Sequence, residues 1–151
     1  MSIQWDNRME IGIPYLDSDH MKLLDVINSL DFRVSDQNID NLKIINILKM
    51  LVRYSAEHFA KEEDLFKRFN YPGNLAHKSS HKNFISKVVG LQKLFLSGDA
   101  HIHSHITIFL VDWLFDHILE EDMQYKRFFM DQYQEVTEYC ALQIRRGKYL
   151  F

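Results

Sequence analysis

Apolar residues recur three and four positions apart along four long stretches of the chain, which is the spacing of one face of an α-helix. These stretches cover about residues 18–34, 41–69, 75–96 and 104–131. Helices of about 20 residues joined by short links favour an antiparallel, up-down-up-down arrangement. We therefore expect an all-α protein, built as a four-helix bundle.

Turn-forming and polar residues separate the predicted helices. Asp17 or Ser18 is placed to cap the first helix, and Asp40 is placed to cap the second. Three short segments rich in turn formers are predicted to be loops or helix ends: 35–39, 70–74 and 97–99.

The two ends of the chain fall outside this helical pattern. Residues 1–16 have no helical period and are predicted to form an extended arm laid on the bundle. Residues 132–151 continue beyond the fourth helix, so we expect a bundle domain over 1–131 and a C-terminal extension over 132–151. The extension is interpreted either as a short helix packed on the bundle or as a segment that docks a partner.

The composition says more about the compartment and the partners of the protein than about its fold. The chain has 151 residues, 46% of them apolar, and a formal net charge of −3. Mild acidity gives no reason to expect nucleic acid as a partner, and no apolar run approaches the ~20 residues of a membrane span. No secretory signal is visible, and the single cysteine, Cys140, cannot form an internal disulfide. We expect a soluble, cytoplasmic protein with no membrane partner.

Seven residues on the predicted apolar faces could bind metal. They are His20, His58, Glu62, His77, His81, His117 and Asp122. Residues four apart on a helix lie only ~40° apart around its axis, so two such side chains can reach one metal centre. The pairs with this spacing are His58–Glu62 and His77–His81. A single pair is more often a surface coincidence, and a lone histidine among leucines is usually a core residue.

The combination of these residues changes the interpretation. Burying five imidazoles and two carboxylates without partners would cost several kcal/mol each, and a metal cluster removes that cost. Imidazole suits iron, and a carboxylate has two oxygens with which to bridge two metals. The set therefore favours a pair of iron ions.

These residues and their neighbours resemble the hemerythrin family, in particular its bacterial single-domain type. The matching pieces are Trp5, Asp17–His20, His58–Glu63, Tyr71–Pro72 with His77 and His81, and Trp113–Ile118 with Asp122. The resemblance covers about residues 1–131. It implies that one iron is saturated by three histidines and that the other keeps a vacant position. The residues implied for the two irons are His77, His81 and His117, then His20 and His58, with Glu62, Asp122 and a solvent-derived oxo or hydroxo group as bridges.

The resemblance further implies reversible O2 binding. In that family O2 binds end-on at the open iron. Each iron gives up one electron, which reduces O2 to peroxide, and the bridging hydroxide donates its proton to the bound peroxide. Ferritin-like di-iron oxidases instead use Glu-x-x-His pairs, and no histidine here has a glutamate three residues before it. We expect oxygen storage, delivery or buffering without enzymatic turnover. The O2 pocket is expected from residues beside the ligands: Leu23, Phe59, Trp113, Leu114 and Ile118.

Two other functions remain open for the same irons. One is an O2 or redox sensor that signals to an unidentified protein partner through residues 132–151. The other is the reduction of peroxide or nitric oxide.

The fourth helix sets geometry against resemblance. His117 and Asp122 are five residues apart, which places them ~140° apart on a regular α-helix, whereas Glu121 is only four residues on. The resemblance selects Asp122 as the bridge. A π-type turn adds one residue and would bring Asp122 to the metal face, so we expect such a turn between 117 and 122. We expect Glu63, Glu120 and Glu121 to face outward.

Three further histidines alternate near the start of the fourth helix. They are His101, His103 and His105. A spacing of two places helical side chains ~200° apart, so these imidazoles cannot converge on one metal. We expect a solvated loop there.

Overall fold

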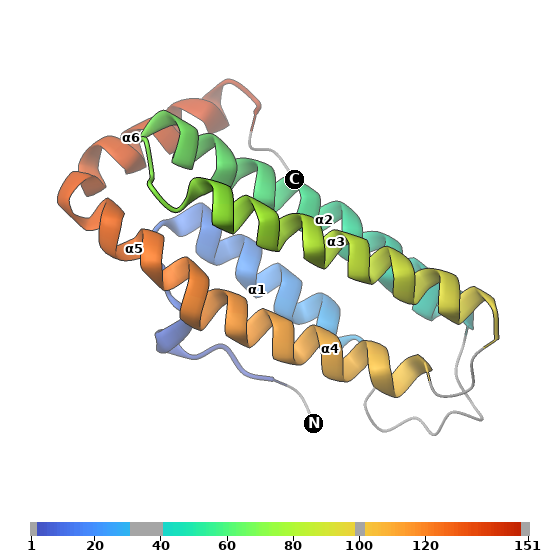
Figure 1. The fold of residues 1–151 in the computed structure, drawn as a ribbon. Coiled ribbons are helices and arrows are strands. Elements are labelled where there is room, and N and C mark those ends of the chain that lie inside the picture. Colours follow the sequence, from blue (N-terminus) through green and yellow to red (C-terminus); the bar gives the residue numbers. More distant parts are fainter. Residues whose placement is uncertain (1–2, 31–40, 99–101, 149–151) are drawn as a thin grey trace.

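The computed structural model describes residues 3–30, 41–98 and 102–148, and four long helical segments pack side by side (Figure 1). In chain order these are α1 (Pro14–Asn28), α2 (Asn41–Arg68), α3 (Asn74–Leu96), and a continuous segment made of α4 (Ile102–Asp116), a π-helical turn η3 (His117–Asp122) and α5 (Met123–Phe129). Successive segments run in opposite directions (Figure 1). The predicted all-α four-helix bundle is confirmed. The predicted loop 35–39 and the cap at Asp40 lie outside the described residues.

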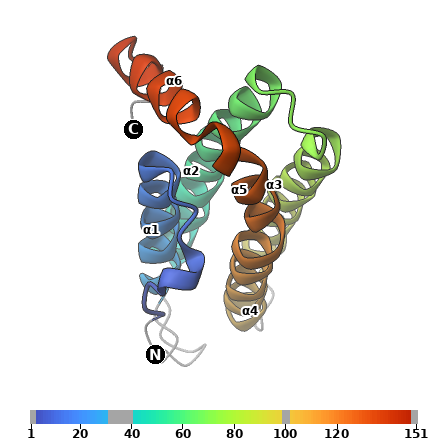
Figure 2. The same ribbon diagram turned by 90° about the vertical axis from the view of Figure 1, so that its left-hand side faces the viewer.

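A short helix covers one end of the bundle. After α5, a 3-10 turn η4 (Met130–Gln132) leads into α6 (Tyr133–Arg145), which lies across the end where α2 finishes and α3 begins (Figures 1 and 2). The Tyr139 hydroxyl donates a hydrogen bond of 2.9 Å to Asp64 Oδ2 on α2. The C-terminal segment thus contains a helix packed on the bundle, one of its two interpretations. The division of the chain at residue 131 stays a prediction.

The N-terminal arm lies on the bundle as expected, but its detail differs from the prediction. It contains a 3-10 turn η1 (Asn7–Met9), and Met9 and Ile11 are buried. α1 begins at Pro14, ahead of the predicted caps, because proline at the first helical position is already fixed near the helical φ. The prediction that Asp17 or Ser18 caps this helix is therefore wrong. Asp17 instead accepts hydrogen bonds of 2.7 and 2.9 Å from the backbone N–H groups of Ile11 and Gly12.

The predicted break at 70–74 is confirmed as the link between α2 and α3. Asn70 has a positive φ of 53°, which reverses the chain after α2. A Cβ at Gly73 would lie 2.6 Å from the Tyr71 ring, so the close packing of that ring requires glycine. The link directs α3 back along α2, with its first turns beside the last turns of α2 (Figure 1).

Two apolar clusters form the core. One joins α1, α2, α3 and α4 towards the far end of the bundle and includes Leu48, Val88 and Ile106. The other lies under α6 and joins Phe66 and Tyr125 to residues of the arm and of α6. Buried polar residues lie between the two clusters, and they form the candidate site described below.

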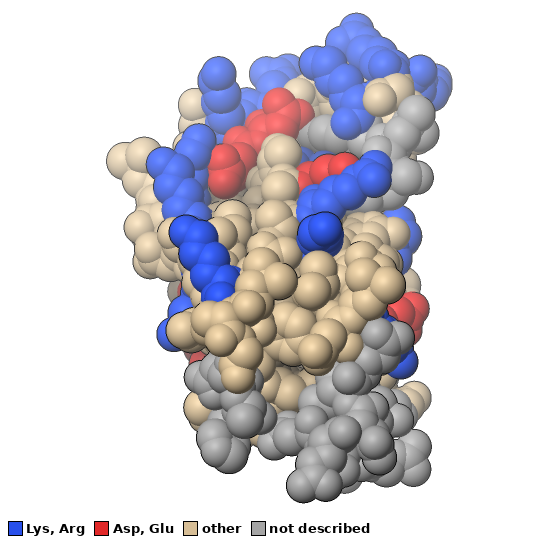
Figure 3. Space-filling view, turned by 90° about the vertical axis from the view of Figure 1, so that its right-hand side faces the viewer, with Lys and Arg blue, Asp and Glu red and all other residues tan. Residues whose placement is uncertain are grey.

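Figure 3 shows the end opposite α6. Lysine and arginine side chains gather in its upper and left parts, with some acidic side chains between them and other residues in the middle (Figure 3). Within the described residues, no helix combines the length and the apolar character needed to cross a membrane.

Candidate metal centre

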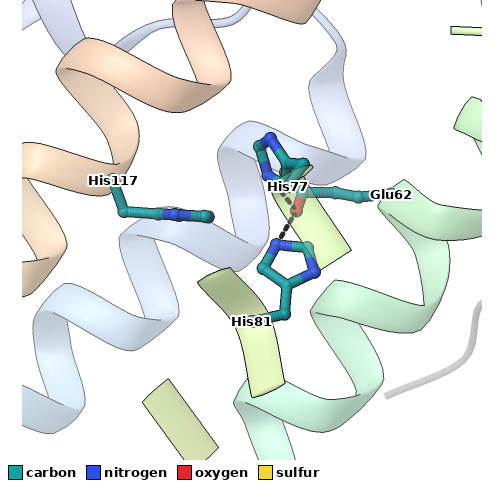
Figure 4. A group of neighbouring side chains, drawn as sticks. All are labelled: Glu62, His77, His81 and His117. Atoms are coloured by element: carbon teal, nitrogen blue, oxygen red, sulfur yellow. Dashed lines mark ion pairs between the residues drawn. The ribbon is translucent and has the colours of Figure 1, made fainter. Parts of the chain in front are cut away.

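The structure brings all seven predicted ligands to one place inside the bundle. α1 contributes one, and α2, α3 and the π-turn η3 contribute two each. Each side chain is at most 5% exposed. Figure 4 shows part of the set, with His81 and His77 pointing at Glu62 and His117 approaching from the fourth helical segment.

Two groups of these side chains could each hold a metal ion. The three-histidine group consists of Glu62, His77, His81 and His117, and the two-histidine group consists of His20, His58, Glu62 and Asp122. Within each group, one nitrogen or oxygen atom per residue lies within 4.8 Å of every other. Glu62 belongs to both groups, so the two candidate sites share a carboxylate.

Glu62 lies between the two groups and turns one oxygen to each. Its Oε2 lies 3.0 Å from His81 Nε2 and 3.5 Å from His77 Nε2. Its Oε1 lies 3.4 Å from His58 Nε2, in the two-histidine group. This orientation suits a carboxylate that bridges two metal ions.

Asp122 has the same relationship to the two groups. Its Oδ1 lies 3.2 Å from His77 Nε2 and 3.1 Å from His117 Nε2, both in the three-histidine group. Its Oδ2 lies 3.1 Å from His20 Nε2. The site therefore has two carboxylates, each facing both groups.

Several of the converging atoms are buried without a hydrogen-bond partner. They include Glu62 Oε2, the Nε2 atoms of His77, His81 and His117, and both carboxylate oxygens of Asp122. Their nitrogen and oxygen atoms lie 3.0–3.5 Å from one another, yet they do not form hydrogen bonds. Buried polar atoms are rarely left unsatisfied. Metal ions in that space would satisfy them, so the residues fit a metal pair.

The charges of the cluster shift its pKa values strongly. Burial lowers the pKa of His58, but Glu62 and Asp19 outweigh burial and raise it to about 10. Burial also lowers the pKa of His77, and Asp122 and Glu62 raise it to about 10. Burial and Glu62 raise the pKa of Asp122, but the surrounding imidazoles hold it at about 2. Protons and metal ions thus compete for the same imidazole nitrogens.

The predicted π-turn in the fourth segment is confirmed, and it spans His117–Asp122. Both residues that bound it are buried, and Asp122 points into the cluster. Glu121 does not reach the centre, and its side chain is 37% exposed. The extra residue of the π-turn corrects the ~140° separation that a five-residue spacing would otherwise produce.

Three carboxylates lie behind the candidate ligands, on the Nδ1 side of their rings. The distances are 3.4 Å for Asp19 Oδ2 to His58, 3.1 Å for Glu63 Oε1 to His81, and 3.2 Å for Glu121 Oε2 to His117. The expectation that Glu63 and Glu121 face outward is therefore wrong, although Glu120 is exposed as predicted.

The roles of these carboxylates were missed from the sequence. Metal-binding histidines usually donate their second ring N–H to a carboxylate or carbonyl. That rule, applied to the four-residue spacing of His117 and Glu121, could have indicated this pair. Asp19 and Glu63 contact histidines on other helices, so no local spacing indicates them.

Tyr125 is a further residue of the site that the sequence analysis did not indicate. Its hydroxyl donates a hydrogen bond of 2.6 Å to Glu62 Oε1, and the side chain is fully buried. Burial and the nearby charges of Asp122 and Glu62 raise its pKa well above 10, so the hydroxyl keeps its proton.

The prediction of a solvated loop near the start of the fourth helix is wrong for His103. α4 begins at Ile102, earlier than the predicted start near residue 104, so His103 lies in its first turn and is only 7% exposed. His105 is exposed on α4, and His101 lies outside the described residues.

The predicted O2-pocket residues pack in the apolar cluster beside the site. Leu23, Leu114 and Ile118 are buried, and none is more than 3% exposed. Phe59 stacks on the His81 ring with centroids 3.8 Å apart, and Trp113 stacks on His117 at 4.3 Å. The two aromatic residues therefore cover the three-histidine group.

Fold and site together define a class of protein: a four-helix bundle whose core holds two linked groups of histidines and carboxylates able to bind metal ions. Residues 11–129 match the profile of the hemerythrin HHE cation binding domain. The chain belongs to the hemerythrin family. The matched range ends before α6 begins at Tyr133.

Individual relatives agree with this assignment. The chain is 34% identical over 122 residues to a hemerythrin-like protein of Naegleria gruberi, covering 81% of this chain and 89% of that protein. It is 31% identical over 121 residues to the bacteriohemerythrin of Stenotrophomonas maltophilia, covering 80% and 77% of the two chains. The crystal structure of a wild-type hemerythrin superposes with a TM-score of 0.74 at 26% identity, covering 84% of this chain and 97% of the other.

Proposed function

We propose that this protein binds two iron ions and uses them to bind O2 reversibly, for oxygen storage, delivery or buffering. The orientation of Glu62 and Asp122 carries the proposal, because each presents one oxygen to each histidine group. Two carboxylates placed in this way can bridge a closely spaced metal pair, and imidazole with carboxylate suits iron. A solvent-derived oxo or hydroxo group would complete the bridge.

The two groups would then have different tasks. His77, His81 and His117 would saturate one iron, while His20 and His58 would hold the other and leave a position for O2. When bound, the iron pair would supply the electrons that O2 binding draws on. The phenol of Tyr125 would hold Glu62 in its bridging position through the hydrogen bond to Oε1.

The apolar surroundings support binding over turnover. Leu23, Leu114 and Ile118 would exclude water from the open position, since all three side chains are buried beside the site. Phe59 and Trp113 would shield the three-histidine group through their stacking contacts. A carrier needs such shielding, because water and protons promote loss of bound O2 as reduced oxygen species.

Metal analysis and optical spectroscopy test the proposal. Protein produced with ample iron should contain two iron atoms per chain. After anaerobic reduction, air should produce a stable oxygenated spectrum, and removal of O2 should restore the reduced one. One tightly held zinc per chain with no iron uptake would overturn the metal assignment. Rapid irreversible oxidation would overturn the carrier function. Steady consumption of peroxide or nitric oxide with a reductant would favour an enzyme instead.

Location and partner also belong to the proposal. Cys140 is a buried free thiol, which fits a reducing compartment such as the cytoplasm. If oxidation of the centre instead signals to a partner, the proteins captured by the full chain should differ between its reduced and oxidised states. Removal of residues 132–151 should abolish that difference.

A further inference from the structure

A buried lysine lies behind the two-histidine group. Lys61 on α2 is only 5% exposed, and its Nζ donates a hydrogen bond of 2.6 Å to Asp19 Oδ2 on α1. The same carboxylate oxygen accepts a hydrogen bond of 3.4 Å from His58 Nδ1. Lysine, aspartate and histidine therefore form a chain that ends on a candidate metal ligand.

The other carboxylates behind the centre have more exposed surroundings. Glu63, behind His81, is 24% exposed and pairs at 3.1 Å with Lys78, whose side chain is 46% exposed. Glu121, behind His117, is 37% exposed and accepts a hydrogen bond of 2.9 Å from Ser80. Water screens charges at such positions, whereas a charge in the dry interior acts with far less screening. Lys61 is therefore placed to influence the centre more than Lys78 is.

We infer that Asp19 and Lys61 form a buried ion pair that positions His58 and sets its strength as a metal ligand. A second lysine, Lys22, lies 3.5 Å from the other oxygen of Asp19, but its side chain is 42% exposed, so water screens its charge. The inference rests on the proposed function for the identity of the metal. Asp19 accepts the Nδ1 proton of His58, which leaves Nε2 free to face the metal. The positive charge of Lys61 offsets that of Asp19, so the carboxylate draws less strongly on that proton. His58 is then a less electron-rich ligand than it would be beside Asp19 without Lys61.

This arrangement has a consequence for the redox balance of the centre. A stronger, more anionic ligand stabilises ferric iron, and a neutral ligand beside a buried positive charge favours ferrous iron. Ferrous iron is the state that the proposed O2 binding requires. The pair would therefore keep the midpoint potential of the iron at His20 and His58 higher than a lone Asp19 carboxylate would.

Redox titration of matched variants tests this effect. Lys61→Met keeps most of the length of the side chain and removes the charge, and it should lower the midpoint potential of the iron-loaded protein. Lys78→Met removes the same charge from the exposed pair behind His81, and it should shift the potential much less. Adding Asp19→Asn to Lys61→Met also removes the carboxylate charge and should bring the potential back towards the starting value. Equal shifts in the two lysine variants, or no shift in Lys61→Met at full iron content, would overturn the inference.

A second measurement separates the pair from the proposed function. In the Lys61→Met background, adding Asp19→Ala removes the hydrogen-bond acceptor of His58 from a protein that already lacks the Lys61 ammonium group. Loss of such an outer partner typically costs about 10–100-fold in metal affinity, which competition with a chromophoric chelator for Zn2+ would measure. That loss in a protein without O2 binding would support the pair while counting against the proposed function. Unchanged Zn2+ affinity would overturn the pair whatever the O2 result.

Discussion

The hydroxyl of Tyr125 on α5 donates a hydrogen bond of 2.6 Å to Oε1 of Glu62 on α2, and both side chains are fully buried. The raised pKa of the phenol keeps it a donor over the whole working range of pH. Because the other oxygen of Glu62 faces His81, this bond holds the shared carboxylate in place between the two groups.

Removing that hydroxyl should weaken the site from within. Tyr125→Phe keeps the ring, which packs 5.1 Å from the Phe66 ring centroid, and leaves Glu62 Oε1 buried without its donor. A buried group left unsatisfied costs about 1–3 kcal/mol, so the free energy of unfolding of the metal-free variant should fall by that amount, measured as a lower urea midpoint. Tyr133→Phe is the control, because its hydroxyl donates an exposed hydrogen bond of 2.7 Å to the Gly12 carbonyl oxygen, which water can satisfy when the hydroxyl is lost, so it should change stability less. Equal stability of the two variants would show that the bond does not hold Glu62.

The π-turn leads to a prediction about two adjacent acids. Asp122→Asn should lower the iron content sharply, because both oxygens of Asp122 face candidate ligands. Glu121→Gln should keep most of the iron, since that side chain only lies behind His117 at 3.2 Å. Elemental analysis of the two purified variants decides between the acids. Loss of iron in the Glu121 variant alone would reverse the assignment.

Leu114 is expected to guard the proposed O2 position. Leu114→Ala removes a side chain that is 3% exposed and should cost about 2–5 kcal/mol through the cavity it leaves. Water would reach the iron pair more easily, so the oxygenated form should oxidise faster. Leu94→Ala, at a 50% exposed leucine on α3, provides the control. Unchanged oxidation in the Leu114 variant, with the iron content intact, would exclude this role.

The metal-free protein should lose stability as the pH rises. His58 and His77 have pKa values raised to about 10 in the folded chain, against about 6.5 when unfolded. Their contribution to the free energy of unfolding is fully present below pH ~6.5 and is lost as the pH rises towards about 10. Urea unfolding of metal-free protein at several pH values measures this.

The iron-loaded protein provides the control for this pH dependence. Metal binding replaces the imidazole protons, so its stability should not fall over the same pH range and should drop when a chelator removes the metal. A metal-free protein whose stability is flat or rises between pH 6.5 and 10 would contradict the prediction.

Much of the fold and of the candidate site follows from the sequence by itself. Helical periodicity is a local property, so four helices and the inward placement of His58 and Glu62 follow from spacing alone. The five-residue separation of His117 and Asp122, together with the family resemblance, was enough to predict the π-turn, since one extra residue must be absorbed within one turn. The hemerythrin family was also recognisable from the sequence, because its motifs are short, local stretches of residues.

The tertiary structure decided the contacts between helices. Asp19 meets Lys61 across 42 residues, and Tyr125 meets Glu62 across 63. Such contacts depend on the relative rotation and depth of packed helices, which local spacing does not determine. The burial of His103 in the first turn of α4 was also evident only in the packed structure. The sequence therefore determined which residues could bind metal, and helix packing decided which charges surround them, because electrostatic interactions depend on distance and burial in three dimensions.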